Sequence, residues 1–394
     1  MIQLATQKQC TGCMACADSC PTQAITRIIA EDGHPYIHID HTTCVGCHKC
    51  ERVCPSVNNY KHAQNTLNLS TPYASYASES KHRERASSGG VFAAIAQYII
   101  STGGKVYGAE LADNTLNHIA IEKVEDIARL QGSKYMLSNT LGIYKQVKHD
   151  LDNNRTVLFS GLGCQVGALL SFLGKHRNID NLYTIDLICG GVPSTLLVKR
   201  FLNESPSKPS KIVAFRDRKA YIFSYIRNGQ TIKADRKERA LPLYGYTSGL
   251  TNRYSCNNCQ FAGTHRQSSI TIGDFWHDPR KEIDRSVIIC HDKKGEELIK
   301  NAQLNNETIA WNNFLPFNPR MAYGKTLYSN RIERRILSHA LNKWSYNTIE
   351  KVYATKIATY NIPWMIYKVE RYCFQKLNHL IAKWHIKKLL RKQQ

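Results

Sequence analysis

Short apolar runs in the middle of the chain are each followed by a glycine turn and then by a helical pattern. Residues 156–159 and 182–188 have the composition of buried strands, and helical patterns follow them at 165–173 and 194–202. Strand–turn–helix units in succession indicate parallel strands joined by crossover helices. We therefore expect an α/β domain in this part of the chain.

Two flanking segments extend this prediction. A helix is predicted at 91–100 and a strand at 105–111. Residues 211–237 alternate as an antiparallel meander, with a hairpin turn predicted at Asn228-Gly229. The expected fold class is therefore mixed, α+β and α/β.

The composition excludes disorder and predicts a chain without membrane spans. Of 394 residues, 42% are hydrophobic and 21% are charged. The longest mainly apolar stretch, 91–100, is far shorter than the roughly 20 residues that a spanning helix needs. The first nine residues do not resemble a secretory signal, so we expect a cytoplasmic protein with reduced thiols.

Eight of the 14 cysteines lie in the first 54 residues, in two copies of the spacing C-x2-C-x2-C-x3-C. In each copy a proline follows the last cysteine. The spacing is typical of two 4Fe-4S clusters, in which the fourth cysteine of each copy binds the other cluster. We expect one cluster at Cys10, Cys13, Cys16 and Cys54, and a second at Cys44, Cys47, Cys50 and Cys20. A zinc site or disulfides are the alternatives, but zinc ribbons use paired C-x2-C units.

Four later cysteines are candidates for a third cluster. Cys164 and Cys189 follow the two predicted parallel strands, and Cys256 and Cys259 form another C-x2-C unit. The carboxyl ends of parallel strands line a ligand crevice, so the first two sulfurs would converge if these strands are neighbours. From the residues alone, other interpretations stay open: a redox dithiol, half of a zinc site, a nucleophile at Cys164, or buried structural cysteines.

Two polar segments are candidate ligand contacts. The first is Ser87, Ser88, Gly89 and Gly90 before the helix at 91–100, and the second is Gly132, Ser133, Lys134 and Tyr135. Hydroxyls and glycines at a helix start bind anions, and Lys134 would meet a phosphate or a flavin. An ordinary serine cap and a solvated lysine are the alternatives.

Other charged residues also have two interpretations. Arg216, Arg218 and Arg227 either face an anionic substrate or lie on a solvated strand face. Asp274 in Gly273-Asp-Phe-Trp276 either lies beside a flavin or closes a turn. Cys290 and Cys373 are interpreted as structural.

In this order, the motifs resemble the coenzyme F-420 hydrogenase/dehydrogenase beta-subunit family, in versions with an N-terminal dicluster ferredoxin. The resemblance rests on the following segments: Ser87-Ser-Gly-Gly90, Gly132-Ser-Lys-Tyr135, Phe159-Ser-Gly-Leu-Gly-Cys-Gln165, Cys189-Gly-Gly-Val-Pro-Ser194, Tyr254-Ser-Cys-Asn-Asn-Cys259 and Ile272-Gly-Asp-Phe-Trp276. It implies FAD in the middle domain, contacts from the first two segments to the flavin, and a 4Fe-4S cluster at Cys164, Cys189, Cys256 and Cys259. One departure is Gly161-Leu-Gly-Cys-Gln165, where family members usually have Gly-Thr-Pro-Cys-Gln.

Four parts are expected along the chain, and the resemblance implies a redox function. We expect a dicluster ferredoxin domain at 1–60, a linker at 61–85, a flavin and 4Fe-4S reductase domain at 86–315, and a basic helical extension at 316–394. The expected function is electron transfer between a reduced ferredoxin or similar donor and an organic substrate, with a link to surface-polysaccharide synthesis in many family members. The alternative is a non-catalytic electron-transfer subunit of a larger complex. No catalytic residue is predicted.

The net charge of +22 is concentrated at the end of the chain, where residues 320–394 contain 16 basic and three acidic residues. Residues 363–392 predict one helix with an apolar stripe and many basic side chains. Either this helix contacts an anionic membrane surface, or its stripe packs on the protein. Nucleic-acid binding is not expected, because no recognition module accompanies the charge.

Overall fold

The computed structural model describes residues 2–58, 64–65, 70–176, 178–218, 220–234, 241–280, 282–324 and 331–353. The predicted basic helix at 363–392, with Cys373, lies outside these residues. No helix in the described ranges is both long and apolar enough to cross a membrane.

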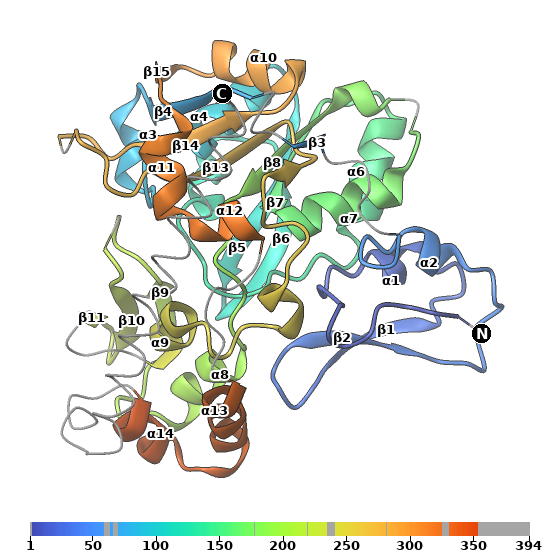
Figure 1. Ribbon diagram of the computed structural model, residues 1–394, viewed down its shortest axis with the longest axis vertical. Helices are drawn as coiled ribbons and strands as arrows, with labels where there is room; N and C mark the ends of the chain where they lie inside the picture. Colours follow the sequence, from blue (N-terminus) through green and yellow to red (C-terminus); the bar gives the residue numbers. More distant parts are fainter. Residues whose placement is uncertain are drawn as a thin grey trace.

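The N-terminal segment folds into a small unit beside the main body of the molecule (Figure 1). Its elements are helices α1 (Ala15–Ser19) and α2 (Lys49–Arg52) and strands β1 (Ile25–Ile29) and β2 (Pro35–Ile39). The two strands form an antiparallel pair in which Ile25 lies opposite Ile39. Each short helix contains the third cysteine of one triplet, Cys16 in α1 and Cys50 in α2, so the sequence repeat is also a structural repeat.

An eight-stranded mixed sheet forms the centre of the molecule, with strand order β15-β4-β14-β13-β8-β7-β5-β6. Strands β5, β7, β8 and β13 are parallel neighbours, and the remaining pairings are antiparallel. The expected mixed α/β architecture is confirmed. The strands are β4 (Pro72–Ala77), β5 (Lys105–Ala112), β6 (Thr115–Ile121), β7 (Val157–Leu162), β8 (Leu182–Leu187), β13 (Ile270–Asp274), β14 (Ser286–Cys290) and β15 (Leu304–Thr308).

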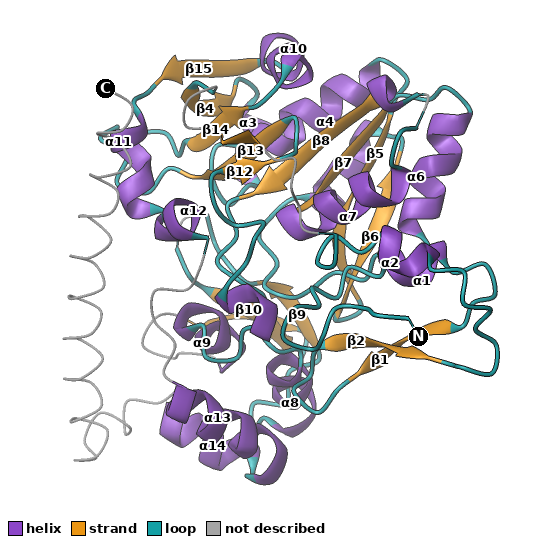
Figure 2. Cartoon of the chain, turned by 45° about the vertical axis from the view of Figure 1, so that its right-hand side comes forward, coloured by secondary structure: helices purple, strands orange, loops and turns teal. Residues whose placement is uncertain are grey.

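Helices cover both faces of this sheet (Figure 2). They are α3 (Ser80–Glu84), α4 (Val91–Ser101), α5 (Ile127–Leu130), α6 (Ile143–Asp152), α7 (Gly163–Leu173), α10 (Lys293–Asn301), α11 (Trp311–Phe314) and α12 (Pro319–Tyr323), with 3-10 turns at Val124–Asp126, Ile179–Asn181 and Leu315–Phe317. Alternate residues of β7 point to opposite faces, as in any strand. Leu158 packs in the core under α4 and α10, whereas Val157 and Phe159 pack under α6 and α7.

The predicted meander is a separate three-stranded sheet with its own core. Strands β9 (Lys211–Ala214), β10 (Phe223–Arg227) and β11 (Gln230–Ala234) are antiparallel neighbours. Asn228 and Gly229 both have positive φ, as the predicted hairpin turn requires. The helices packed around this sheet are α8 (Leu196–Glu204), α9 (Leu241–Ser248), α13 (Arg331–Lys343) and α14 (Tyr346–Tyr353). Tyr254–Asn257 form a 3-10 turn, and β3 (Gln64–Asn65) pairs with β12 (His265–Arg266).

Two predicted boundaries differ from the structure. We expected a linker at 61–85, but Pro72–Ala77 form β4, which is paired on both sides inside the large sheet, and Ser80–Glu84 form α3. The basic extension was expected to begin at 316, yet Leu337 and Leu341 of α13 are buried in the core of the meander. Only their long-range partners assign these two segments to the folded body.

The N-terminal unit docks on the α6–α7 face of the sheet. Cys13 and Ala15 belong to the same apolar cluster as α6 and α7. Asp18 of α1 accepts hydrogen bonds from the backbone N–H groups of Gly142 (2.6 Å) and Tyr144 (3.2 Å), at the start of α6. A carboxylate at a helix N-terminus is favourable because free N–H groups and the helix dipole both face it. This contact fixes the first cysteine triplet against the sheet.

Candidate iron–sulfur and flavin site

The two N-terminal cysteine loops have the same backbone conformation. Gly12 and Gly46 have φ of 73° and 65°, and Met14 and His48 have φ of 61° and 57°. Left-handed residues at equivalent places turn each chain sharply, so that three cysteines surround one space. The two loops share this backbone conformation because their cysteines have the same spacing.

The structure brings Cys54 of the second copy to the first triplet. Burial raises the pKa of the Cys13 thiol to about 12, and the nearby Cys10 and Cys54 raise it further. The pKa of Cys16 is also raised by burial, with contributions from Cys13, Cys10 and Cys54. These four cysteines are therefore neighbours, although Cys54 is distant in sequence from the other three. We refer to Cys10, Cys13, Cys16 and Cys54 as the inner group.

The other four N-terminal cysteines lie farther out. Burial raises the pKa of Cys50, and Cys47 adds to the shift. Cys20 packs against the same small apolar cluster that contains Cys50. Cys47 is exposed to solvent. We refer to Cys20, Cys44, Cys47 and Cys50 as the outer group.

The four later cysteines also converge. Strands β7 and β8 are parallel neighbours, so Cys164, at the start of α7, and Cys189, after β8, lie at the same edge of the sheet. Burial raises the pKa of Cys164 well above its usual value, with contributions from Cys259, Cys189, Cys256 and Cys13. We refer to Cys164, Cys189, Cys256 and Cys259 as the third group.

Cationic side chains favour thiolates in the third group. Burial raises the pKa of Cys256 to about 12, whereas the charge of Arg320 lowers it. Arg320 and Arg266 act in the same direction on the pKa of Cys259. Arg320 also donates a 2.6 Å hydrogen bond from Nη1 to the backbone oxygen of Cys256. Buried thiols with cations nearby have the chemistry that an iron–sulfur cluster requires.

Among the described residues, no group of three or more histidine, cysteine or carboxylate side chains is arranged to hold one metal ion. A cubane attaches its four thiolates to four different irons, so its ligand sulfurs lie farther apart than those around one zinc ion.

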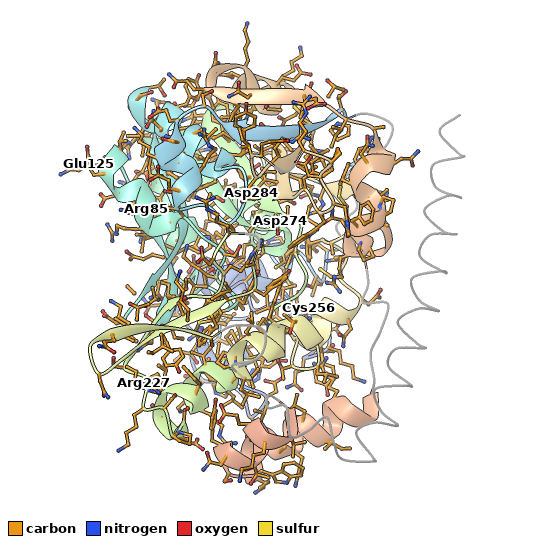
Figure 3. All side chains as sticks on the ribbon, turned by 90° about the vertical axis from the view of Figure 1, so that its left-hand side faces the viewer. Arg85, Glu125, Arg227, Cys256, Asp274 and Asp284 are labelled. Carbon is orange, nitrogen blue, oxygen red and sulfur yellow. The ribbon has the colours of Figure 1, made fainter. Side chains whose placement is uncertain are left out.

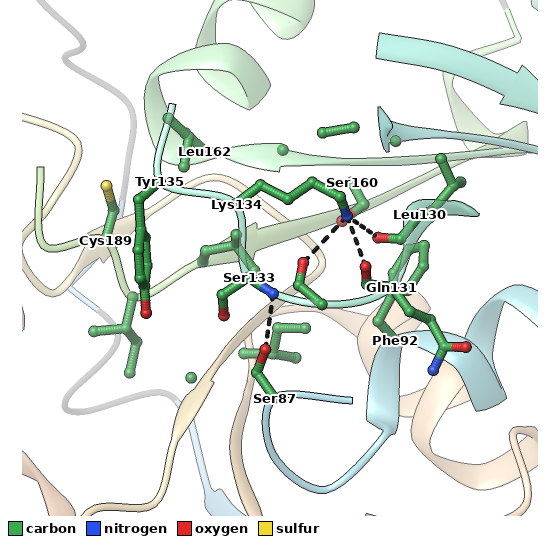
Figure 4. Close-up of a pocket in the computed structure, with 18 of the residues that line it drawn as sticks. Ser87, Phe92, Leu130, Gln131, Ser133, Lys134, Tyr135, Ser160, Leu162 and Cys189 are labelled. Atoms are coloured by element: carbon green, nitrogen blue, oxygen red, sulfur yellow. Dashed lines mark hydrogen bonds between the residues drawn. The ribbon is translucent and has the colours of Figure 1, made fainter. Parts of the chain in front are cut away.

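A cavity of about 280 Å³ lies at the carboxyl edge of the parallel strands, between the large sheet and the meander. Of the eight residues predicted to contact a flavin, seven line it: Ser87, Ser88, Gly90, Gly132, Ser133, Lys134 and Tyr135. Cys189 of the third group lines it as well (Figure 4). The cavity therefore touches the third cysteine group directly.

Gly89 is the exception, because it lies behind the cavity wall. A Cβ atom at Gly89 would lie 2.4 Å from the backbone oxygen of Ser75 and 2.8 Å from the backbone nitrogen of Ser286. Its N–H donates to Ser286 Oγ at 3.0 Å. Gly89 thus allows the loop to approach β4 and β14 closely.

The two predicted loops hold each other in place. Ser87 Oγ accepts a 2.7 Å hydrogen bond from the backbone N–H of Ser133 (Figure 4). Lys134 Nζ donates to the backbone oxygens of Leu130, Gln131 and Gly132, at 3.0, 2.7 and 3.1 Å. Lys134 is therefore not a solvated lysine, because its ammonium group caps the C-terminal end of α5 through these hydrogen bonds. Burial lowers the pKa of Lys134 to about 8.

Aromatic rings form one wall of the cavity. Tyr135 and Tyr246 stack with their ring centroids 3.6 Å apart and their planes at 6°. Arg216 also lines the cavity and forms a 2.7 Å ion pair with Asp274, and its guanidinium lies over Tyr221 and Trp276. Arg216 is therefore a buried wall residue, whereas Arg227, at the far end of β10, lies well away from Asp274 (Figure 3). Flat apolar rings with a few fixed polar groups suit a planar heteroaromatic ligand.

His118 also lines the cavity, although the sequence did not predict it as a site residue. Its Nε2 lies 3.1 Å from the backbone oxygen of Ser160, and its ring stacks on Phe159. Its Nδ1 is buried without a hydrogen-bond partner in the described part of the chain. A buried polar atom beside such a cavity is suited to contact a ligand. No sequence motif marks this histidine, because it lies alone in an ordinary alternating strand, β6.

The variant turn Gly161-Leu-Gly-Cys-Gln165 is closed by its own glutamine. Gln165 Oε1 accepts a 2.9 Å hydrogen bond from the N–H of Leu162, and Gln165 Nε2 donates to Ser138 Oγ at 2.9 Å. Leu162 and Gln165 both line the cavity. The departure from the family pattern therefore leaves an ordered turn at this point.

Comparison with known proteins agrees with the two-part organisation. Residues 9–58 match the 4Fe-4S dicluster domain. Residues 154–312 match the family described as the C terminus of the coenzyme F420 hydrogenase/dehydrogenase beta subunit. The chain thus joins a dicluster domain to a region of that beta-subunit family, and the resemblance inferred from sequence is confirmed. It is a redox iron–sulfur protein related to these beta subunits.

No curated protein matches the sequence significantly. A chain of the F420-reducing nickel–iron hydrogenase complex from Methanosarcina barkeri, solved as a xenon derivative, is similar in structure with a TM-score of 0.46 and 15% sequence identity. The match covers 73% of this chain and 94% of that chain. At this TM-score we draw no functional conclusion from the likeness.

Proposed function

We propose that this chain is an iron–sulfur flavoprotein oxidoreductase that passes electrons between a ferredoxin-type donor and an organic substrate. In this proposal the inner and outer groups hold two 4Fe-4S clusters, the third group holds another, and the cavity holds FAD. Bound clusters supply one-electron carriers, and a flavin exchanges single electrons with clusters and electron pairs with organic molecules.

One chain of contacts carries the proposal. Cys13 of the inner group interacts electrostatically with Cys164 of the third group, and the pKa of buried Tyr144 is affected by both sulfurs. Cys189 of the third group lines the cavity. Cys16 of the inner group packs in the same apolar cluster as Cys20 and Cys50 of the outer group. The three groups and the cavity therefore form a continuous series in which each site adjoins the next.

The exposure of the cysteines suggests the direction from which a donor approaches. The outer group includes exposed Cys47, and the neighbouring Val45 is 67% exposed. The inner and third groups are more deeply buried, with Cys13 and Cys164 enclosed by the docked domains. We infer that a protein donor meets the outer group and that the organic substrate meets the cavity.

Anaerobic purification followed by iron, sulfide and flavin assays tests this proposal. We expect about twelve irons and one FAD for each chain, from three four-iron clusters. Eight irons without flavin would contradict the third cluster and the flavin, and would leave a dicluster ferredoxin joined to a domain without a redox cofactor. A full cofactor set with no reduction of any small molecule, but restored activity of a partner enzyme, would favour a non-catalytic subunit.

Substitution of a single cysteine isolates the third cluster. Cys164→Ala should lower the iron content to about eight for each chain and slow flavin reduction by the N-terminal clusters. Cys290→Ala is the matched control, because Cys290 is buried but donates only to the backbone oxygen of Asp292 and belongs to none of the three groups. It should keep about twelve irons.

The link to surface-polysaccharide synthesis and the cytoplasmic location remain predictions from sequence.

A further inference from the structure

Arg253 is a completely buried cation at the boundary between the N-terminal unit and the reductase domain. Its side chain is among the largest with less than 2% exposure. Its Nη1 and Nη2 atoms have no hydrogen-bond partner within the part of the chain that the structure describes. A buried, unpaired guanidinium is costly unless a negative charge compensates it. A compensating negative charge is therefore expected close to the Arg253 guanidinium.

The surroundings of Arg253 connect two of the cysteine groups. Its Nε donates a 2.6 Å hydrogen bond to the backbone oxygen of Cys10, in the inner group. Its own backbone oxygen accepts a 3.0 Å hydrogen bond from the N–H of Cys256, in the third group. Arg253 is thus bonded to the loops of both groups.

The guanidinium packs on the loop that surrounds the inner group. A Cβ atom built on Gly12 would lie 3.0 Å from Arg253 Nη1 and 3.1 Å from Cζ. Gly12 lies between Cys10 and Cys13, and a side chain at this position would press on the cation. On its other side the guanidinium lies 4.1 Å from the ring centroid of Tyr36. No carboxylate forms an ion pair with Arg253 in the described ranges. The carboxylate of Asp32 accepts a hydrogen bond from the Tyr36 hydroxyl instead.

The missing counter-charge has a direct chemical source. A four-iron cluster with four thiolate ligands is a net anion, and its negative charge increases by one unit on reduction. A fixed cation close to it stabilises the reduced form more than the oxidised form, and therefore raises the reduction potential. Local charge and hydrogen bonding are among the main determinants of cluster potentials.

We propose that Arg253 sets the reduction potential of the cluster held by Cys10, Cys13, Cys16 and Cys54, and so controls how electrons are shared between this cluster and the third group. The inference rests on the cluster part of the proposed function. It requires neither a particular substrate nor a bound flavin.

The test is a potentiometric titration of the full-length, cluster-loaded protein, followed by electron paramagnetic resonance. We expect the inner-group potential to fall in the order wild type, Arg253→Lys, Arg253→Gln. Lysine keeps the charge, but its compact ammonium lacks the guanidinium fork that packs on Gly12. For Arg253→Gln we expect at least a tenfold shift in the reduction equilibrium, about 59 mV for one electron. The shifting signal should be the one absent from Cys13→Ala.

Arg334→Gln is the matched control. Arg334 lies over Tyr254 at 4.2 Å and donates to the backbone oxygen of Asn252 and, at 3.4 Å, to Asn257 Oδ1 in the Cys256–Cys259 loop, so it supports the same segment without a hydrogen bond to the inner group. The inner-group potential of this variant should equal that of the wild type. If Arg253→Gln does not retain the cluster, the second neutral variant Arg253→Met decides: a potential below that of Arg253→Lys supports the proposal, and a potential equal to that of the wild type overturns it.

Other results separate this proposal from a purely structural role. Equal shifts in Arg253→Lys and Arg253→Gln, an unchanged potential in Arg253→Gln, or loss of about four irons from both variants would each overturn it, because charge would not be the controlling property. Absence of iron from the wild-type protein would instead contradict the proposed function itself.

Discussion

Cys13 and Cys164 lie close enough for the charge of one sulfur to raise the pKa of the other, although they belong to different domains. Cys13 lies in the first N-terminal loop, and Cys164 lies in the first turn of α7. Thr140 supports this approach by donating a 2.8 Å hydrogen bond to the backbone oxygen of Cys13. The docking of the N-terminal unit thus determines which of its two cysteine groups faces the reductase domain.

The exchange of Cys20 and Cys54 between the two repeats is testable by iron counting. If Cys13 and Cys54 share a cluster, Cys13→Ala/Cys54→Ala should lose one cluster and keep about eight of twelve irons. Cys13→Ala/Cys20→Ala should lose two clusters and keep about four. The reverse pattern would show that each repeat binds its own cluster. Alanine at Cys290 serves as the control for cysteine substitution in general.

Gly89→Ala should destabilise the fold without removing a flavin contact. The added methyl group would collide with backbone atoms of Ser75 and Ser286, at 2.4 and 2.8 Å. Overpacking of this kind costs about 1–3 kcal/mol. Gly263→Ala is the control, because its nearest contact would be 3.8 Å away. Urea denaturation under anaerobic conditions measures the difference, and equal stability of both variants would show that the loop can move away from β4.

His118 should make the protein sensitive to mild acid. Burial lowers its pKa from 6.5 to about 4. Between these values the unfolded chain binds a proton that the folded chain does not bind. The stability contributed by the neutral ring is therefore complete above about pH 6.5 and is lost as the pH falls towards 4.

His118→Gln should consequently lose less stability than the wild type between pH 7 and pH 5. The measurement is the urea midpoint at the two pH values, and acid loss of clusters affects all variants alike. His41→Gln, at an exposed position, is the control and should follow the wild type. If the urea midpoint of His118→Gln falls as much as that of the wild type, the lowered pKa of His118 is not the cause of the acid sensitivity.

Lys134→Met should expose the structural role of the ammonium group. The substitution removes the donor for three backbone oxygens at the end of α5. Two of these hydrogen bonds are partly buried, so we expect a loss of about 1 kcal/mol, at the lower end of the range for unpaired buried acceptors. Lys148→Met is the control, because Lys148 is 46% exposed and pairs only with Asp152, so its loss should cost less than about 0.5 kcal/mol. Similar denaturation midpoints for the two variants would mean that water replaces Lys134 in the loop.

Local sequence was a good guide where the signal is local. The spacing of the eight N-terminal cysteines predicts a dicluster domain, and the comparison with known families confirms it. Strands β7 and β8, helix α4 and the Asn228-Gly229 hairpin were expected within a few residues of their observed positions. Periodicity and turn chemistry depend on neighbours along the chain, so these elements are visible without a partner.

Sequence was a poor guide where long-range contact decides. Residues 72–77 look like a polar linker, but pairing with β14 and β15 makes them a strand. Arg216 looks like an exposed strand residue, but Asp274 from another sheet turns it into a buried wall residue of the cavity. His118 and Arg253 carry no motif at all.

The sequence by itself determined the two N-terminal cysteine repeats, their repeated loop conformation and the strand–turn–helix units, because spacing and periodicity encode them directly. Only the tertiary structure decided that the inner group faces Cys164, that Cys189 borders the cavity, and that Arg253 is enclosed between two thiol-bearing loops. Those relationships arise from docking surfaces separated by more than a hundred residues, and burial at such surfaces has no periodic signature in the chain.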